Sequence, residues 1–313
     1  MSANDCASNW AGLLVGWRRY GRSVNGYWVG DSGGRGFELV LNALRARLTN
    51  GTYEIGDRLP TQRDLANHFS VSRDTVQRVL KALAGEGWIE SRQGSGTRVI
   101  MTQLIQFPTT KAAQPGRAVM LGSLISEAFE QPEITLDVYT LTSESLDAHV
   151  RVQAERIRAG EIAPQRIALR MLLPSEELEL PYPRPKDPAY NEPMRQRLLG
   201  ITRLHTMSLQ GALRELRTDG LIHTVDIEIR HAPLAPTFKL YLFNGAEVLQ
   251  GPYEVIERRI ELDSGDEIEA LDVLGFGATL THYVKDDDPN SQGSVSVASM
   301  QSWFDSVWNL LST

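Results

Sequence analysis

Residues 59–100 have the sequence LPTQRDLANHFSVSRDTVQRVLKALAGEGWIESRQGSGTRVI, and this stretch decides the fold of the N-terminal part of the chain. Thr61 precedes a segment whose apolar residues recur at helical spacing, and Asp64 stands three residues later, where the Glu of a capping box stands. Ser72 occupies the capping position of a second helical segment a few residues further on. Two short helices joined by a tight corner predict a helix-turn-helix.

Sequence patterns on either side extend this motif. Upstream, residues 36–50 have the pattern of an amphipathic helix, with apolar residues at Phe37, Val40, Leu41, Leu44 and Leu48. Downstream, residues 88–91 and 97–100 are strand-like and are joined by the turn sequence RQGSG. A helix before the pair and a β-hairpin after it predict a winged helix-turn-helix.

This predicted winged helix-turn-helix resembles the GntR family of bacterial transcription regulators over residues 36–100. The positions that carry the resemblance are Gly56, Leu59-Pro60-Thr61-Gln62-Arg63-Asp64-Leu65-Ala66, Val71-Ser72-Arg73-Asp74-Thr75-Val76, Leu83, Glu86-Gly87 and Arg92-Gln93-Gly94-Ser95-Gly96-Thr97. The resemblance implies sequence-specific binding of double-stranded DNA, with no enzymatic activity and no cofactor.

The third helix of such a module enters the major groove with its N-terminal end, so we expect DNA contacts there. Arginine suits guanine O6 and N7, glutamine suits adenine N6 and N7, and the free N–H groups of a helix start suit a phosphate. The resemblance implies that Arg63 holds the DNA backbone and that Arg73 reads bases. The predicted helix contacts are Arg63, Ser72, Arg73, Asp74, Thr75 and Gln77, and the predicted wing contacts are Arg92, Gly94, Gly96 and Thr97.

Charge divides the chain into two unlike parts. Residues 34–105 carry ten Lys and Arg against seven Asp and Glu, a net charge of +3, whereas residues 106–313 carry nineteen against thirty, a net charge of −11. The whole-chain value of −7 therefore hides a basic segment that suits DNA. We expect a disordered leader at 1–33, the winged helix-turn-helix at 34–103, a linker at 104–116 and an effector-sensing and dimerisation domain at 117–313.

The acidic part alternates strand-like and helix-like segments, which predicts an α/β domain and, for the whole chain, an α+β multidomain fold. The chain has no run of about 18 apolar residues, so we expect no membrane span. Its single cysteine, Cys6, excludes an intrachain disulfide. The histidines of the acidic part lack the spacing of metal ligands, and we expect each to be a surface or hydrogen-bonded residue.

Residues 237–252 resemble the phospholipase D signature HxK, four residues, D, six residues, GS. Thr237 stands in place of the nucleophilic His, Asn244 in place of the Asp and Pro252 in place of the Ser, and only Lys239 and Gly251 match. Because a threonine without a base cannot do the work of an imidazole, the resemblance implies a catalytically inactive phospholipase D-like domain. It also implies that Lys239 binds an anion; an exposed strand residue is the alternative.

The sequence thus predicts a bacterial, cytoplasmic transcription regulator that associates with the nucleoid when bound to DNA. We expect a repressor that binds an inverted-repeat operator as a homodimer and responds to a small-molecule effector, which is anionic if Lys239 binds it. Two alternatives stay open at this point: a DNA-tethered phosphodiesterase or nuclease, and a constitutive dimer without a ligand.

Overall fold

The computed structural model describes most of the chain beyond the predicted leader. The described residues are 32–49, 52–53, 56–85, 88–92, 96–99, 105–106, 121–262, 264–273, 275 and 279–313. The predicted disordered leader, residues 1–33, lies outside them except for its last two residues. Within the described ranges, no helix is both long enough and apolar enough to cross a bilayer.

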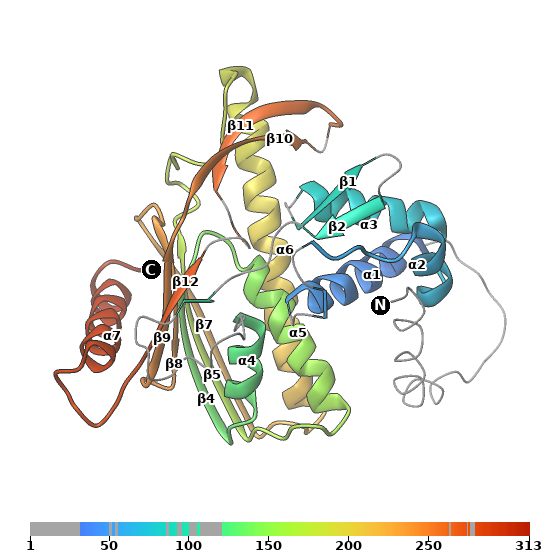
Figure 1. Cartoon of the computed structure of the whole chain (residues 1–313). Coiled ribbons are helices and arrows are strands. Elements are labelled where there is room, and N and C mark those ends of the chain that lie inside the picture. The colour runs from blue at the N-terminus through green and yellow to red at the C-terminus, as the bar shows by residue number, and fades with distance from the viewer. Residues whose placement is uncertain are drawn as a thin grey trace. The chain divides into compact units, whose positions relative to one another are not determined.

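Three helices and a β-hairpin make up the N-terminal domain, as the sequence predicts (Figure 1). They are α1 (Ser32–Thr49), α2 (Gln62–Phe69), α3 (Arg73–Gly85), β1 (Ile89–Arg92) and β2 (Gly96–Val99). The helices enclose one apolar core, whose most deeply buried members include Val40, Leu44, Val76, Leu83 and Trp88. α1 begins at Ser32 and not at residue 36, a start that the sequence pattern missed because glycine has a low helix propensity.

The hairpin is held by the segment that precedes α2. β1 and β2 are antiparallel, with Ser91 opposite Thr97. The backbone N of Gly56 donates to the carbonyl of Val99 (2.8 Å), and the backbone N of Leu59 donates to the carbonyl of Thr97 (2.9 Å). The residues that lead into α2 are therefore tied to the wing, which fixes the wing relative to the helix-turn-helix.

A mixed seven-stranded sheet forms the centre of the C-terminal domain. Its strands lie in the order β3 (Ile105–Gln106), β12 (Leu280–Val284), β9 (Glu247–Pro252), β8 (Phe238–Phe243), β4 (Glu133–Tyr139), β5 (Arg166–Pro174) and β7 (Thr224–Ala232). β4, β5 and β7 are mutually parallel, whereas β4, β8, β9 and β12 are antiparallel neighbours in turn. The predicted alternation of strands and helices is confirmed by the order β4, α5, β5, α6, β7.

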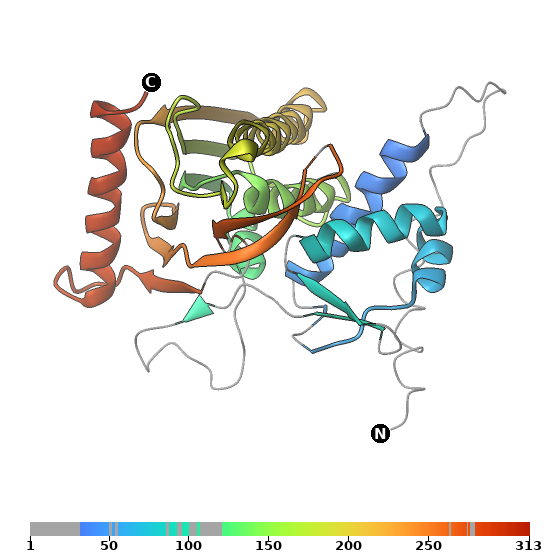
Figure 2. The same cartoon turned by 90° about the horizontal axis from the view of Figure 1, so that it is seen from above.

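Helices cover both faces of this sheet. They are α4 (Leu121–Phe129), α5 (Glu144–Arg158), α6 (Asn191–Thr218) and α7 (Gln292–Leu310). Both views place α4, α5 and α6 on one face and α7 on the other (Figures 1 and 2). Successive side chains of β8 point to opposite faces of the sheet and so belong to different cores. Tyr241 and Phe243 belong to the core under α4 to α6, and Leu240 and Leu242 belong to the core under α7.

Two features of the strands were not predicted from the sequence. β10 (Val255–Glu261) and β11 (Glu267–Val273) pair with each other and with β6 (Arg184–Pro185) in a separate sheet. Within the predicted linker 104–116, Ile105 and Gln106 form β3, which pairs in parallel with β12. A strand of two residues is too short to leave a periodic pattern in the sequence. The rest of the predicted linker lies outside the described residues.

Candidate DNA-recognition surface and effector site

Two side-chain caps fix the starts of the helix-turn-helix pair. At α2, Thr61 Oγ1 accepts a hydrogen bond from the backbone N of Asp64 (3.2 Å) and donates one to its carboxylate (2.6 Å). At α3, Ser72 Oγ accepts from the backbone N of Thr75 (3.0 Å). Both predicted caps are confirmed. The Asp64 carboxylate differs from the Glu of a capping box in that it bonds to the hydroxyl of the capping residue.

Four of the predicted contact residues form an exposed surface at these helix starts. The side chains of Arg63 on α2 and of Arg73, Asp74 and Gln77 on α3 are all exposed. Their helices turn Leu65, Ala66, Val76 and Val79 into the core instead. Charged and amide groups therefore stand on one side of each helix and packing groups on the other, as a helix that binds a groove requires.

Thr75 differs from these four residues. It is 9% exposed, and its hydroxyl lies 2.9 Å from Ser72 Oγ. Its methyl and hydroxyl groups are thus occupied by packing and by the cap of α3. Of the predicted helix contacts, Thr75 has the least surface to offer DNA.

The wing contains a glycine at a position where the backbone dihedral angle φ is positive. Gly96 has a φ of +81°, in the left-handed region that favours glycine. Beside it, Ser91 Oγ and Thr97 Oγ1 form a hydrogen bond of 2.9 Å between the two strands. Gly94 and the side chain of Arg92 lie outside the described parts of the wing, so their DNA contacts stay predictions.

Lys239 in the C-terminal domain is buried, which excludes the exposed strand position that the sequence left open. It is 3% exposed and extends from β8 toward the first turn of α5. Its ammonium group donates to the carbonyl of Gly275 and to Ser145 Oγ (3.4 Å) and lies 5.6 Å from the centre of the Tyr253 ring. Burial lowers the pKa of Lys239 to about 8, although the nearby Glu144 carboxylate acts to raise it.

His149 stands one helical turn after Ser145 and is a second buried titratable group. It is 2% exposed, and its Nε2 has no hydrogen-bond partner. Burial, and after it the positive charge of Lys239, lowers the pKa of His149 to about 3. The prediction that every histidine is a surface or hydrogen-bonded residue is therefore wrong for this one. A neutral imidazole has one N–H donor, and the buried ammonium group of Lys239 supplies a second donor to an anion.

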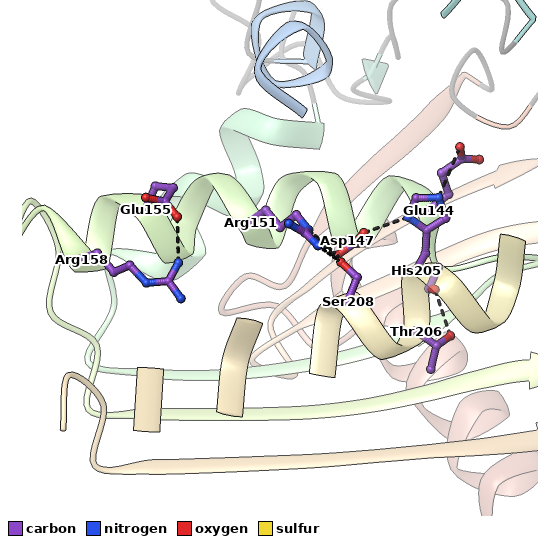
Figure 3. Close-up of polar contacts among 9 residues, drawn as sticks. Glu144, Asp147, Arg151, Glu155, Arg158, His205, Thr206 and Ser208 are labelled. Atoms are coloured by element: carbon purple, nitrogen blue, oxygen red, sulfur yellow. Dashed lines mark hydrogen bonds and ion pairs between the residues drawn. The ribbon is translucent and has the colours of Figure 1, made fainter. Parts of the chain in front are cut away.

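A polar network joins α5 to α6 (Figure 3). Asp147, which is 3% exposed, accepts hydrogen bonds from His205 Nδ1 (2.8 Å), Ser208 Oγ (2.5 Å) and Arg151 Nε (3.2 Å). Nε2 of His205 lies 3.8 Å from a carboxylate oxygen of Glu144. Figure 3 shows these side chains converging on Asp147 from the two helices. The network was not predicted from the sequence, because Asp147 lies 58 residues from His205 and 61 residues from Ser208.

Two other positions that the sequence analysis compared with the phospholipase D signature, Asn244 and Gly251, have structural reasons for their identity. Asn244 follows β8 with a φ of +53°, and its Oδ1 accepts from the backbone N of Thr135 (2.8 Å). Gly251 pairs with Lys239 across the β8–β9 hairpin, and a Cβ at Gly251 would overlap the carbonyl of Thr279. In the described part of the chain, no three His, Cys, Asp or Glu residues are grouped so as to hold a metal ion.

Comparison with known families matches the N-terminal domain. Residues 38–99 match the family model of the bacterial regulatory proteins of the gntR family. The Exu regulon transcriptional regulator of Escherichia coli (strain K12) is 40% identical over 67 residues, which are 21% of this chain and 26% of that protein. The N-terminal domain is therefore a helix-turn-helix domain of the GntR type.

Other similarities are shorter or weaker. The uncharacterized HTH-type transcriptional regulator YdfD of Bacillus subtilis (strain 168) is 27% identical over 125 residues, 36% of this chain and 25% of that protein. A GntR family transcriptional regulator from Listeria monocytogenes is 28% identical in a structural match that covers 20% of this chain and 56% of that one, with a TM-score of 0.20. A TM-score this low does not show a shared overall fold. The chain spans about a quarter of the length of the curated relatives that it matches.

Proposed function

We propose that this protein is a sequence-specific DNA-binding transcription regulator. It binds an inverted-repeat operator as a homodimer and acts as a repressor whose C-terminal domain senses a small ligand. The observation that carries the proposal is the exposed set of Arg63, Arg73, Asp74 and Gln77 on two capped helices of a GntR-type domain. The protein works in the bacterial cytoplasm, on the nucleoid when it is bound to DNA.

The DNA-binding part of the proposal is tested with Arg73→Ala in a gel-shift assay on the protein's own promoter. We expect the specific complex to be lost, because a bidentate arginine contact to guanine supplies roughly 1–3 kcal/mol of discrimination. Arg217→Ala is the matched control, since Arg217 is an exposed arginine at the end of α6. If Arg73→Ala retains specific binding, the recognition helix is wrongly assigned.

For the effector, we propose an anion that contacts Lys239 and His149 in a catalytically inactive phospholipase D-like domain. The buried ammonium, the unpartnered Nε2 of His149 and the pairing of Lys239 with Gly251 support this proposal. A thermal-shift screen with inorganic phosphate and small carboxylates tests it, because a ligand that binds only the folded state raises the melting temperature. The rise should disappear in Lys239→Met. No rise with any anion would favour the constitutive dimer without a ligand.

An enzymatic function is less well supported by the same residues. Asn244 is bound to the backbone of β4, and Thr237 stands where a phosphodiesterase of this type has its nucleophilic histidine. Phosphodiesterase turnover that disappears in Lys239→Met would revive this alternative. The family model matches residues 38–99, so the match carries no information about a ligand of the C-terminal domain.

A further inference from the structure

The exposed side chains on the outward face of α7 are uncharged. The inward face buries Val297, Phe304, Val307 and Trp308 against the sheet. The outward face exposes five side chains at positions i, i+4, i+7, i+11 and i+15, namely Val295, Ser299, Ser302, Ser306 and Leu310. Such a spacing keeps all five on one stripe of the helix.

The absence of charge on this stripe is unusual for a surface helix, whose solvent face normally carries charged residues. Asp305 is the single charged residue among the nineteen of α7, and Arg170 binds it at 2.9 Å. Residues 106–313 as a whole carry thirty acidic residues against nineteen basic ones, a net charge of −11. A second copy of so acidic a domain is repelled by most of the surface but not by this stripe.

We infer that the outward face of α7 binds the same face of a second copy of this chain. An antiparallel pair with its two-fold axis between Ser302 and Trp303 places Val295 opposite Leu310 of the second copy and Ser299 opposite Ser306 of the second copy. The two exposed apolar residues thus meet each other twice, and small side chains face each other in between. A two-fold interface requires this kind of self-complementary surface.

The chemistry of the stripe suits burial. Small side chains let two helices approach to the short end of the usual 8–10 Å separation of their axes. Ser306 Oγ already donates to the carbonyl of Trp303 (2.7 Å), so covering this hydroxyl leaves no donor unsatisfied. A groove of about 470 Å³, whose lining includes Ala298, Ser302 and Asp305, runs beside the stripe and can take a side chain of the second copy.

This inference rests on the proposed function, because binding to an inverted-repeat operator requires a dimer. The inference adds that the outward face of α7 is the dimer interface. The test is Ser302→Arg in the full chain, which sets two arginines face to face at the axis. Thr218→Arg, at the exposed end of α6, is the matched control. Sedimentation velocity over a concentration series gives the mass, and circular dichroism confirms folding. We expect the wild type and Thr218→Arg to be dimers and Ser302→Arg to be a monomer.

Two results would overturn the inference in distinguishable ways. If the wild type stays monomeric at every concentration, both the proposed dimeric regulator and the proposed α7 interface are wrong. If the wild type is a dimer and Ser302→Arg is a dimer as well, the α7 interface is wrong and the proposed function is unaffected.

Cross-linking tests the register of the two helices. Cys6 is the single cysteine of the chain, so Cys6→Ser gives a background without thiols. In it, Ser302→Cys should form a disulfide-linked dimer under mild oxidation, whereas Thr218→Cys should stay monomeric on a denaturing gel. A wild-type dimer whose Ser302→Cys variant does not cross-link contradicts the axis at Ser302.

Discussion

In the winged helix-turn-helix, four side chains expected to bind DNA are exposed around an apolar core, whereas in the C-terminal domain two clusters of polar side chains, around Asp147 and Lys239, are buried. Arg63, Arg73 and Gln77 are exposed, and Asp147 and Lys239 are each 3% exposed. An exposed group has water as its alternative partner, so losing it changes binding and leaves stability nearly unaffected. A buried polar group depends on its protein partners, so losing it changes stability first.

The largest expected effect comes from Asp147→Ala. Asp147 accepts hydrogen bonds from His205, Ser208 and Arg151, and its removal leaves all three donors without this acceptor. A buried donor left without its acceptor costs about 1–3 kcal/mol, so the loss at His205 and Ser208 together amounts to about 2–6 kcal/mol. Urea unfolding of the full chain should show a loss of this size in the free energy of unfolding.

The control for this loss is an aspartate of the other domain. Asp74 is exposed on α3, so Asp74→Ala should change the free energy of unfolding by less than about 0.5 kcal/mol. If Asp147→Ala and Asp74→Ala lower the free energy of unfolding equally, the buried and the exposed aspartate do not differ in their contribution to stability. Asp147→Asn keeps the shape of the side chain and is the milder variant if the alanine variant does not fold.

The next effect is a pH dependence caused by Lys239. Burial lowers its pKa from 10.5 in the unfolded chain to about 8 in the folded protein. Between these values the unfolded chain binds a proton that the folded protein does not, so stability rises as the pH rises from about 8 to 10.5. The whole rise amounts to about 3 kcal/mol, at roughly 1.4 kcal/mol per pKa unit.

Lys239→Met should abolish this rise, as measured by urea unfolding at several pH values in the window. Burial raises the pKa of Tyr241 and of Tyr253, so both contribute stability that is lost at still higher pH. The difference between wild type and Lys239→Met isolates the lysine. A difference that does not change with pH would mean that Lys239 titrates normally and is not desolvated.

A smaller effect, on base preference, is expected at Gln77, an exposed residue of α3. Glutamine suits adenine N6 and N7, and arginine suits guanine O6 and N7. Gln77→Arg should therefore shift the preference at one base of each half-site from adenine to guanine, by about 1–3 kcal/mol. Competition binding with operators that differ at single bases measures this shift, and the melting temperature should not change. A uniform loss of affinity on all sequences would mean that Gln77 contacts the backbone.

The two domains also differ in how far the sequence could predict them. In the N-terminal domain the deciding signals are local: Thr61 and Ser72 cap their helices through the residue three positions on, and Gly96 turns the wing through its own φ. Local signals are visible in a sequence. The helices, caps and hairpin were predictable for this reason.

In the C-terminal domain the pairings join residues far apart along the chain. Asp147 meets His205, and Ser145 meets Lys239, 94 residues away. The alternation of strands and helices was predictable from the apolar patterns, but the separation of β10 and β11 into a second sheet was not. Strand pairing and burial of polar groups depend on tertiary contacts, which a single sequence does not reveal.

The smallest effect is expected at Ser72, and it tests whether one residue can contribute both to stability and to DNA binding. Ser72 caps α3 through the backbone N of Thr75 and is also a predicted phosphate contact. Ser72→Ala should lose about 1 kcal/mol of stability with the cap, together with some DNA affinity. Ser72→Asp keeps a cap of equal quality but sets a carboxylate against the phosphate. Its free energy of unfolding should match the wild type while its affinity for operator DNA falls below that of Ser72→Ala. If Ser72→Asp binds DNA as well as the wild type, Ser72 serves the helix alone, and phosphate binding at the start of α3 falls to its backbone N–H groups.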